Sequence, residues 1–177
     1  ALNEDIITPY TIIDTKGRYK EEVYGSQAPR CWINFYNDMH GPIDVTEAIQ
    51  GSCNCFFYEL GELLTIEKLN GYMKQFGLGE PTGIELSEKT GVLAGPEYRI
   101  ENGKPHWMEI DTIMSAIGQS DHLFSPLQLT SYISTLVNDG VRYSAKMLYK
   151  VCRYSTNEVV YERIPEVLNT MNISKES

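Results

Sequence analysis

The stretch Gln50-Gly51-Ser52-Cys53-Asn54-Cys55-Phe56-Phe57-Tyr58-Glu59-Leu60-Gly61 places a hydroxyl and a carboxamide two residues apart, just before an apolar helical pattern. In extended or turn backbone, residues i and i+2 point the same way. Ser52 and Asn54 are therefore expected on one side and Cys53 on the other. A serine hydroxyl can relay a proton, and an asparagine amide both donates and accepts hydrogen bonds, so the pair has the groups that a reaction site needs.

A simpler explanation of the same triplet is a helix cap or a turn, because serine and asparagine are preferred in both. The chain contains a second copy, Ser155-Thr156-Asn157, in a polar turn between two predicted strands. Taken alone, three residues favour the cap or turn in either place. Only the surrounding sequence can distinguish the two copies.

The composition is that of a folded protein: among 177 residues, 42% are hydrophobic and 22% are charged. The net charge is −9 and the basic residues form no cluster, which argues against nucleic-acid binding, since phosphate contacts need concentrated Lys and Arg. No apolar run approaches the ~18–20 residues of a membrane-spanning helix.

Cysteine spacing gives no metal signature. The cysteines are Cys31, Cys53, Cys55 and Cys152. The Cys53-x-Cys55 spacing is tighter than the pairs of zinc sites, and the three histidines stand far apart in the sequence. We therefore expect no metal and no cofactor, and the thiols are expected to be small buried side chains or to form one incidental disulfide.

Helix signals flank the first triplet. Asp44 with Glu47 has the form of a capping box and predicts a short helix over residues 45–50. A second helix follows the triplet, and Thr65 is expected to cap a third. The predicted buried face of the second helix is Phe56, Leu60, Leu63 and Leu64.

A further helix is predicted to start at Ser125, with Pro126 in its first position and Gln128 in its third. Its predicted apolar face is Leu129, Tyr132, Ile133, Leu136 and Val137. Two hairpins are predicted from β-branched and aromatic runs, the first over residues 10–13 and 18–24 and the second over residues 147–154 and 158–161.

Blocks of sequence in a fixed order carry a resemblance to a known family. They are His40-Gly41-Pro42-Ile43-Asp44-Val45-Thr46-Glu47-Ala48-Ile49, Ser52-Cys53-Asn54, Phe56-Phe57-Tyr58, residues 71–79, Thr82-Gly83-Ile84-Glu85-Leu86, Ala116-Ile117-Gly118-Gln119, Ser125-Pro126-Leu127-Gln128 and Asn138-Asp139-Gly140. From about residue 7 to residue 151 the chain resembles the transpeptidase domain of class B penicillin-binding proteins, and most of all the elongation type, penicillin-binding protein 2.

The resemblance implies an α+β fold, mainly helical and similar to that of serine β-lactamases. We expect residues 1–177 to be part of one such domain, with its helical lobe and part of its antiparallel sheet. The family's site combines S-x-x-K, S-x-N and K-T-G motifs. Only the middle motif is matched here: Ser52 is expected to relay protons, and Asn54 is expected to hold a substrate amide.

The departures from the family pattern limit what the chain alone is expected to do. No serine begins an S-x-x-K, and Lys89-Thr90-Gly91 precedes Gly118-Gln119 whereas the family's third motif follows that block. We therefore interpret Lys89-Thr90-Gly91 as a surface turn. The nucleophile is expected upstream of Ala1 and the true third motif beyond Ser177, so the isolated chain is expected neither to turn over substrate nor to form a penicilloyl adduct.

The implied parent protein is a serine D,D-transpeptidase that cross-links the D-Ala-D-Ala stem peptides of peptidoglycan through an acyl-enzyme, which β-lactams also form. It is expected at the extracytoplasmic face of the bacterial membrane, with cell-wall elongation proteins as partners. The alternatives are a β-lactam-sensing receptor domain and a non-catalytic scaffold module. Exposed apolar residues are predicted near residues 10–13 and 147–151, where they could support a dimer.

Overall fold

A computed structural model describes residues 1–171 and residue 173. The chain divides into two compact units. Among the described residues, the first unit comprises 1–69 and 94–122, and the second comprises 70–93, 123–171 and 173. Within this part of the chain, no helix combines the length and the apolar character that crossing a membrane requires.

The first unit is mainly helical, with one small antiparallel strand pair. Its elements are η1 (Leu2–Glu4), β1 (Ile13–Thr15), α1 (Glu21–Tyr24), η2 (Gly25–Gln27), η3 (Trp32–Tyr36), β2 (Gly41–Ile43), α2 (Val45–Gln50), the first part of α3 (Asn54–Gln75), α4 (Pro96–Glu101) and α5 (Glu109–Ser115). In the sheet, Ile13 lies opposite Ile43 and Thr15 opposite Gly41.

The core of this unit forms around the start of α3. Phe56 is fully buried, Tyr58 and Leu60 are nearly so, and Ile113 of α5 is buried in the same cluster. Burial of apolar side chains of this size contributes about 1.5–3 kcal/mol each. The residues after the first triplet therefore fix the first part of α3 in the first unit.

The predicted helices on both sides of the first triplet are confirmed. In α2, the Asp44 carboxylate accepts a hydrogen bond from the Glu47 amide at 2.9 Å, and the Glu47 carboxylate accepts one from the Asp44 amide. The helix path of α3 breaks at Thr65, where φ is 67° and ψ is 160°. Leu63 was predicted to be buried, but it is 48% exposed.

The predicted hairpin over residues 10–13 and 18–24 is wrong. The strand begins only at Ile13, and its partner is β2, which lies much later in the sequence. Residues Glu21–Tyr24 instead form one helical turn, α1, entered through Lys20 at φ 47°. An ion pair between Arg18 and Glu21 at 2.6 Å supports that turn, which β-propensity alone could not indicate.

The second unit joins the remainder of α3 to a helix and two strand pairs. Its further elements are α6 (Pro126–Val137), β3 (Val141–Tyr143), β4 (Lys150–Cys152), β5 (Val159–Glu162) and β6 (Val167–Thr170). The predicted start of α6 is confirmed, because Ser125 and Gln128 form a capping box and Pro126 takes the first position.

The predicted buried face of α6 is wrong. Gln128 is fully buried instead, since its side-chain amide donates to the carbonyls of Glu80 at 2.9 Å and Thr90 at 2.7 Å. Ile133 and Leu136 are each 51% exposed, and Leu129 is 46% exposed. Buried polar groups need hydrogen-bond partners, and helical periodicity does not reveal where such partners lie.

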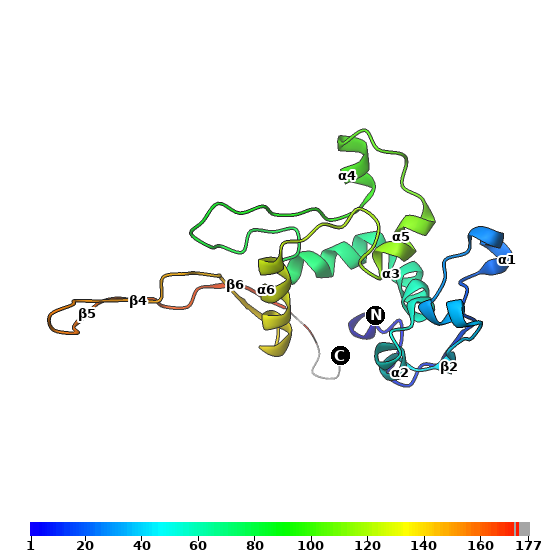
Figure 1. Cartoon of the computed structure of the whole chain (residues 1–177), viewed down its shortest axis with the longest axis horizontal. Helices are drawn as coiled ribbons and strands as arrows, with labels where there is room; N and C mark the ends of the chain where they lie inside the picture. Colours follow the sequence, from blue (N-terminus) through cyan, green and yellow to red (C-terminus); the bar gives the residue numbers. More distant parts are fainter. Residues whose placement is uncertain (172, 174–177) are drawn as a thin grey trace. The chain divides into compact units, whose positions relative to one another are not determined.

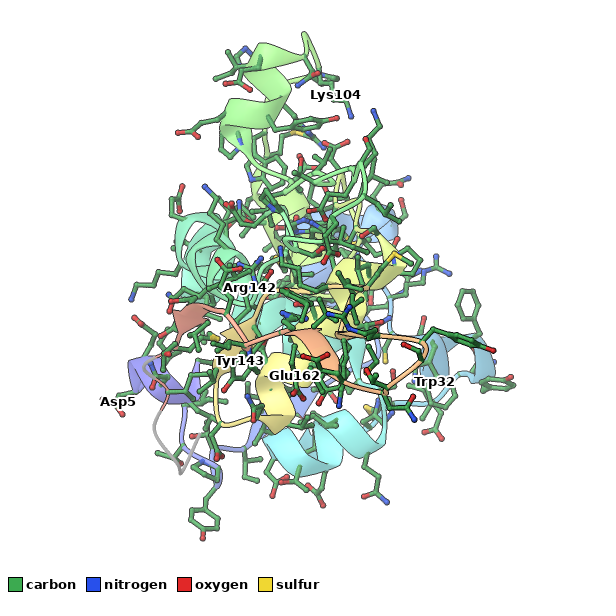
Figure 2. All side chains as sticks on the ribbon, turned by 90° about the vertical axis from the view of Figure 1, so that its left-hand side faces the viewer. Asp5, Trp32, Lys104, Arg142, Tyr143 and Glu162 are labelled. Atoms are coloured by element: carbon green, nitrogen blue, oxygen red, sulfur yellow. The ribbon has the colours of Figure 1, made fainter. Side chains whose placement is uncertain are left out.

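The strands of the second unit pair antiparallel, β3 with β6 and β4 with β5, so the second predicted hairpin is confirmed. Figure 1 shows β4 and β5 extending away from α6, and every residue of both strands is exposed. Strand alternation is clear in β3, where Arg142 is buried and Tyr143 is exposed (Figure 2).

The predicted exposure of apolar residues is confirmed within each unit. Tyr10 is 85% exposed and Ile12 is 57% exposed in the first unit. In the second unit, Met147 and Tyr149 are each 67% exposed. Association of two copies through such residues stays a prediction.

Candidate functional site

The Ser52 turn, residues 51–53, lies between α2 and α3. The Cys53 amide donates to the Ala48 carbonyl at 2.9 Å and the Ser52 amide donates to the Ile49 carbonyl at 3.2 Å. These bonds form a Schellman motif, in which the residue after the helix cap is left-handed and is usually glycine. Here it is Ser52, with φ 49°. A left-handed conformation costs a non-glycine residue about 1–2 kcal/mol, so the turn carries a serine where another residue would be more stable.

The turn places Ser52 and Asn54 toward the surface and Cys53 toward the interior, as predicted. Cys53 is fully buried, Ser52 is exposed and Asn54 is half-buried. Ser52 and Asn54 both line a surface depression of about 340 Å³. The other lining residues are Phe57, Ala116 and Ile117. The expected pairing of a hydroxyl and a carboxamide over one surface is therefore confirmed as geometry.

Asn54 is oriented by the segment before η3. Its Nδ2 donates to the Arg30 carbonyl at 3.4 Å, and the Tyr58 hydroxyl one helical turn later donates to the same oxygen at 3.5 Å. The amide nitrogen of Asn54 is thus directed toward the protein. Its carbonyl oxygen remains the group that can accept a hydrogen bond from a molecule in the depression.

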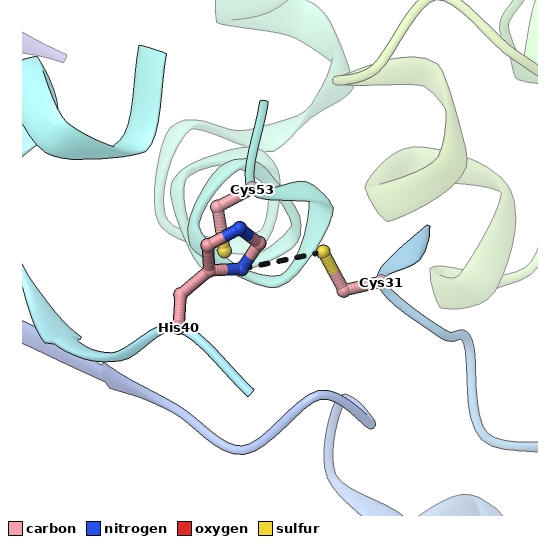
Figure 3. A group of neighbouring side chains, drawn as sticks. All are labelled: Cys31, His40 and Cys53. Carbon is pink, nitrogen blue, oxygen red and sulfur yellow. Dashed lines mark hydrogen bonds between the residues drawn. The ribbon is translucent and has the colours of Figure 1, made fainter. Parts of the chain in front are cut away.

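A cluster of possible metal ligands includes one residue of the turn, Cys53, together with Cys31 and His40 (Figure 3). One ligand atom from each lies within 4.8 Å of the others, and the Cys31 Sγ is 3.7 Å from His40 Nδ1. Two thiols and an imidazole are the donor types that zinc prefers, so these residues could hold such an ion. The other imidazole nitrogen, Nε2, lies 3.1 Å from the Gly51 carbonyl, as in metal sites whose histidine is oriented by a backbone oxygen.

Burial favours the protonated form of the Cys53 thiol and raises its pKa. Burial also raises the pKa of the neighbouring Cys55 to about 12, with a smaller contribution from the nearby thiols of Cys31 and Cys53. Binding of an ion would therefore have to displace thiol protons. The sequence spacing did not predict this cluster, because Cys31 and Cys53 become neighbours only through tertiary packing.

A second polar cluster involves two carboxylates further along α3. The Tyr19 hydroxyl lies 2.9 Å from a Glu59 oxygen and 2.7 Å from a Glu62 oxygen, and Lys20 pairs with Glu62. Burial and the hydrogen bonds to these carboxylates raise the pKa of Tyr19, so its hydroxyl remains a donor. The cluster ties α3 to the segment before α1.

Lys89, Thr90 and Gly91 are exposed and lie outside the strands of the second unit. The Thr90 carbonyl accepts the hydrogen bond from Gln128. The interpretation of this segment as a surface turn is consistent with its irregular, exposed backbone, and it does not present a lysine from a buried strand.

Comparison with known proteins identifies the family. The sequence matches the penicillin binding protein transpeptidase domain over residues 1–177. It is 36% identical over 141 residues to the peptidoglycan D,D-transpeptidase MrdA of Salmonella typhimurium, which covers 79% of this chain and 22% of that protein. It is 38% identical over 124 residues to the stage V sporulation protein D of Bacillus subtilis, covering 70% of this chain and 17% of that protein.

Solved structures agree. Penicillin-binding protein PBP2 from Helicobacter pylori superposes with a TM-score of 0.75 and 25% identity, over 94% of this chain and 28% of that one. PBP2 of Pseudomonas aeruginosa, in complex with WCK 5153, gives a TM-score of 0.81 at 20% identity, over 99% of this chain and 38% of that one. The predicted α+β transpeptidase-like fold is thus confirmed, and the chain spans about a fifth of the length of its MrdA relatives. The chain belongs to the penicillin-binding protein transpeptidase domain family.

Proposed function

We propose that the chain is part of a serine D,D-transpeptidase domain that cross-links peptidoglycan stem peptides ending in D-Ala-D-Ala and is acylated by β-lactams. The observation that carries the proposal is the strained, exposed Ser52 beside Asn54 over one depression. Strain of this kind persists only where the surrounding structure maintains it, and it concentrates at functional sites. The relatives named D,D-transpeptidases support the reaction class.

In this mechanism the Ser52 hydroxyl passes a proton between the base beside the nucleophilic serine and the leaving nitrogen of the substrate. A hydroxyl suits this task because it donates and accepts at the same atom. The Asn54 carbonyl oxygen accepts a hydrogen bond from a substrate amide and holds the peptide over the depression. Acylation and deacylation then proceed as two smaller steps instead of one direct amide exchange.

The same proposal places the protein at the extracytoplasmic face of the bacterial membrane, where peptidoglycan is assembled. A structure of H. pylori PBP2 in complex with MreC, similar to this chain with a TM-score of 0.72, supports a partner of the cell-wall elongation machinery. Exposed apolar residues within each unit could also support a dimer. Sedimentation of the protein over a concentration series would separate self-association from a monomer.

The proposal is tested on the protein as its gene encodes it. Release of D-Ala from a stem peptide ending in D-Ala-D-Ala is expected, and penicillin should block it. Asn54→Ala is expected to lower kcat/KM about tenfold or more, because a hydrogen bond to the substrate amide is lost. Asn157→Ala, in the second triplet, is the matched control and should leave the rate unchanged.

Two other results would overturn the proposal in different ways. Acylation by penicillin without any release of D-Ala would favour the sensing receptor. Absence of both acylation and release, in a protein with an intact fold, would favour a scaffold module.

A further inference from the structure

Two side chains from the segment 31–40, those of Trp32 and His40, form hydrogen bonds with the Ser52 turn. Trp32 Nε1 lies 3.0 Å from the Gly51 carbonyl oxygen and 3.1 Å from the Ser52 carbonyl oxygen, so one indole N–H is shared between two acceptors. His40 Nε2 lies 3.1 Å from the Gly51 oxygen. A carbonyl can only accept, so Nε2 carries the proton and Nδ1 can accept the weak hydrogen bond of the Cys31 thiol.

The two donor side chains also contact each other. The Trp32 and His40 rings meet edge to face with centroids 5.8 Å apart. A Cβ on Gly51 would lie only 3.0 Å from His40 Cδ2, so the glycine permits the close approach of the ring. The Gly51 φ of −82° is an ordinary value, which means that the requirement at this position is space and not backbone conformation.

Helix ends leave backbone carbonyls without partners inside the helix. At the end of α2, the carbonyl of the capping residue Gly51 and the carbonyl of Ser52 just after it receive hydrogen bonds from side chains of the segment 31–40. The left-handed Ser52 is strained, and each external hydrogen bond helps to keep it in place. We infer that Trp32 and His40 are positioning residues, which act through the Gly51 and Ser52 carbonyls to hold the Ser52 hydroxyl over the depression.

The inference rests on the proposed role of Ser52, and its first test does not depend on activity. Trp32→Phe keeps an aromatic ring at this position and removes the N–H donor. In the protein as its gene encodes it, hydrogen exchange of the Ser52 and Cys53 amides is expected to speed up about fivefold to tenfold, while the amide of the buried Leu60, further along α3, is unaffected. Trp107→Phe is the matched control, because that indole donates to Thr112 at 2.9 Å and not to the turn. Unchanged exchange at the turn in Trp32→Phe would overturn the inference.

The second test reads acylation by a labelled penicillin. Trp32→Phe is expected to lower the acylation rate constant about fivefold to tenfold and to change the binding constant less than about twofold, since the donor acts on Ser52 and not on the ligand. His40→Gln, which places an amide donor where Nε2 lies, should retain most of the rate that His40→Leu loses. In a Ser52→Ala background, Trp32→Phe should add no further loss.

These results distinguish a wrong role for Ser52 from a wrong role for Trp32 and His40. If Ser52→Ala acylates at the normal rate, the proposed role of Ser52 is wrong, whereas faster exchange at the turn would still establish the positioning contact. If Ser52→Ala is slow but Trp32→Phe changes neither exchange nor acylation, only the positioning inference is wrong. A loss in Trp32→Phe that adds fully to that of Ser52→Ala would also contradict it.

Discussion

The segments Ser52-Cys53-Asn54 and Ser155-Thr156-Asn157 share a residue pattern but have opposite surroundings. In the first, the middle residue is buried and the carbonyl of Ser52 accepts from Trp32. In the second, all three residues are exposed between β4 and β5. The left-handed residue also differs: it is Ser52 in the first copy and Asn157, with φ 55°, in the second.

That difference separates the turn that we propose to be functional from one that only connects two strands. Asparagine tolerates left-handed backbone better than most residues, so the second turn places a suitable residue where the chain must reverse. The Asn157 backbone amide donates to the Arg153 carbonyl at 2.9 Å, which closes the turn. The first turn instead keeps a serine in the unfavourable position, next to the fully buried Cys53.

The largest expected difference between the regions of the two triplets is in the labelling rate of their cysteines, Cys53 and Cys152. Cys152 of β4 is exposed, whereas Cys53 is fully buried and the pKa of the nearby Cys55 is raised to about 12. Because the thiolate is the reactive form, labelling of native protein by a disulfide reagent at pH 8 should be about a thousandfold faster at Cys152. Mass spectrometry after brief labelling is the measurement. Equal modification of Cys53 would show that its region opens readily.

Truncation of an aromatic side chain next to each triplet should have unequal effects on stability. Phe56→Ala removes a fully buried ring and is expected to lower the free energy of unfolding by about 3–5 kcal/mol. Tyr154→Ala, beside the second triplet, removes a fully solvent-exposed ring and should change it by less than about 0.5 kcal/mol. Urea denaturation followed by circular dichroism measures both. Similar values for the two variants would contradict the assigned core.

Although the cysteine spacing predicted no metal site, the grouping of Cys31, His40 and Cys53 leads us to expect that zinc stabilises the protein. Added to reduced protein, it is expected to raise Tm, with a gain of about 2.7 kcal/mol when free zinc exceeds Kd a hundredfold. Cys53→Ser should lose this effect and Cys152→Ser should keep it, because only Cys53 lies with Cys31 and His40. A Tm that zinc does not change in the parent protein would mean that the three side chains form only a buried polar contact.

Replacement by glycine tests the strain in each turn and should give the smallest effect. Ser52→Gly is expected to raise the free energy of unfolding by about 1 kcal/mol, while the loss of its hydroxyl should impair acylation. Asn157→Gly relieves less strain and is expected to stay within about 0.5 kcal/mol of the parent protein. Thermal unfolding of both variants gives the comparison. A destabilised Ser52→Gly would argue against strain at this position.

Local signals in the sequence predicted the local structure well. The capping boxes at Asp44 and Ser125 and the break at Thr65 are set by neighbouring residues, and all three are found in the structure. The placement of Ser52 and Asn54 on one side also follows from the chain geometry near the triplet. These features depend on contacts a few residues apart.

What the sequence did not predict depends on distant contacts. The partner of β1 is β2 and not the next apolar run. Gln128 is buried because carbonyls from a remote loop satisfy its amide. The contacts of Trp32 with the Ser52 turn likewise require the fold, because no periodicity links an indole to the end of another helix.

The central claim is that the first Ser-x-Asn copy carries chemistry and the second does not. The most direct measurement is the rate of acylation by a labelled penicillin in Ser52→Ala and Ser155→Ala, made in the protein as its gene encodes it. Loss of a proton relay should slow Ser52→Ala about a hundredfold or more, and Ser155→Ala should stay within about twofold of the parent protein. Equal rates in the two variants would contradict the account.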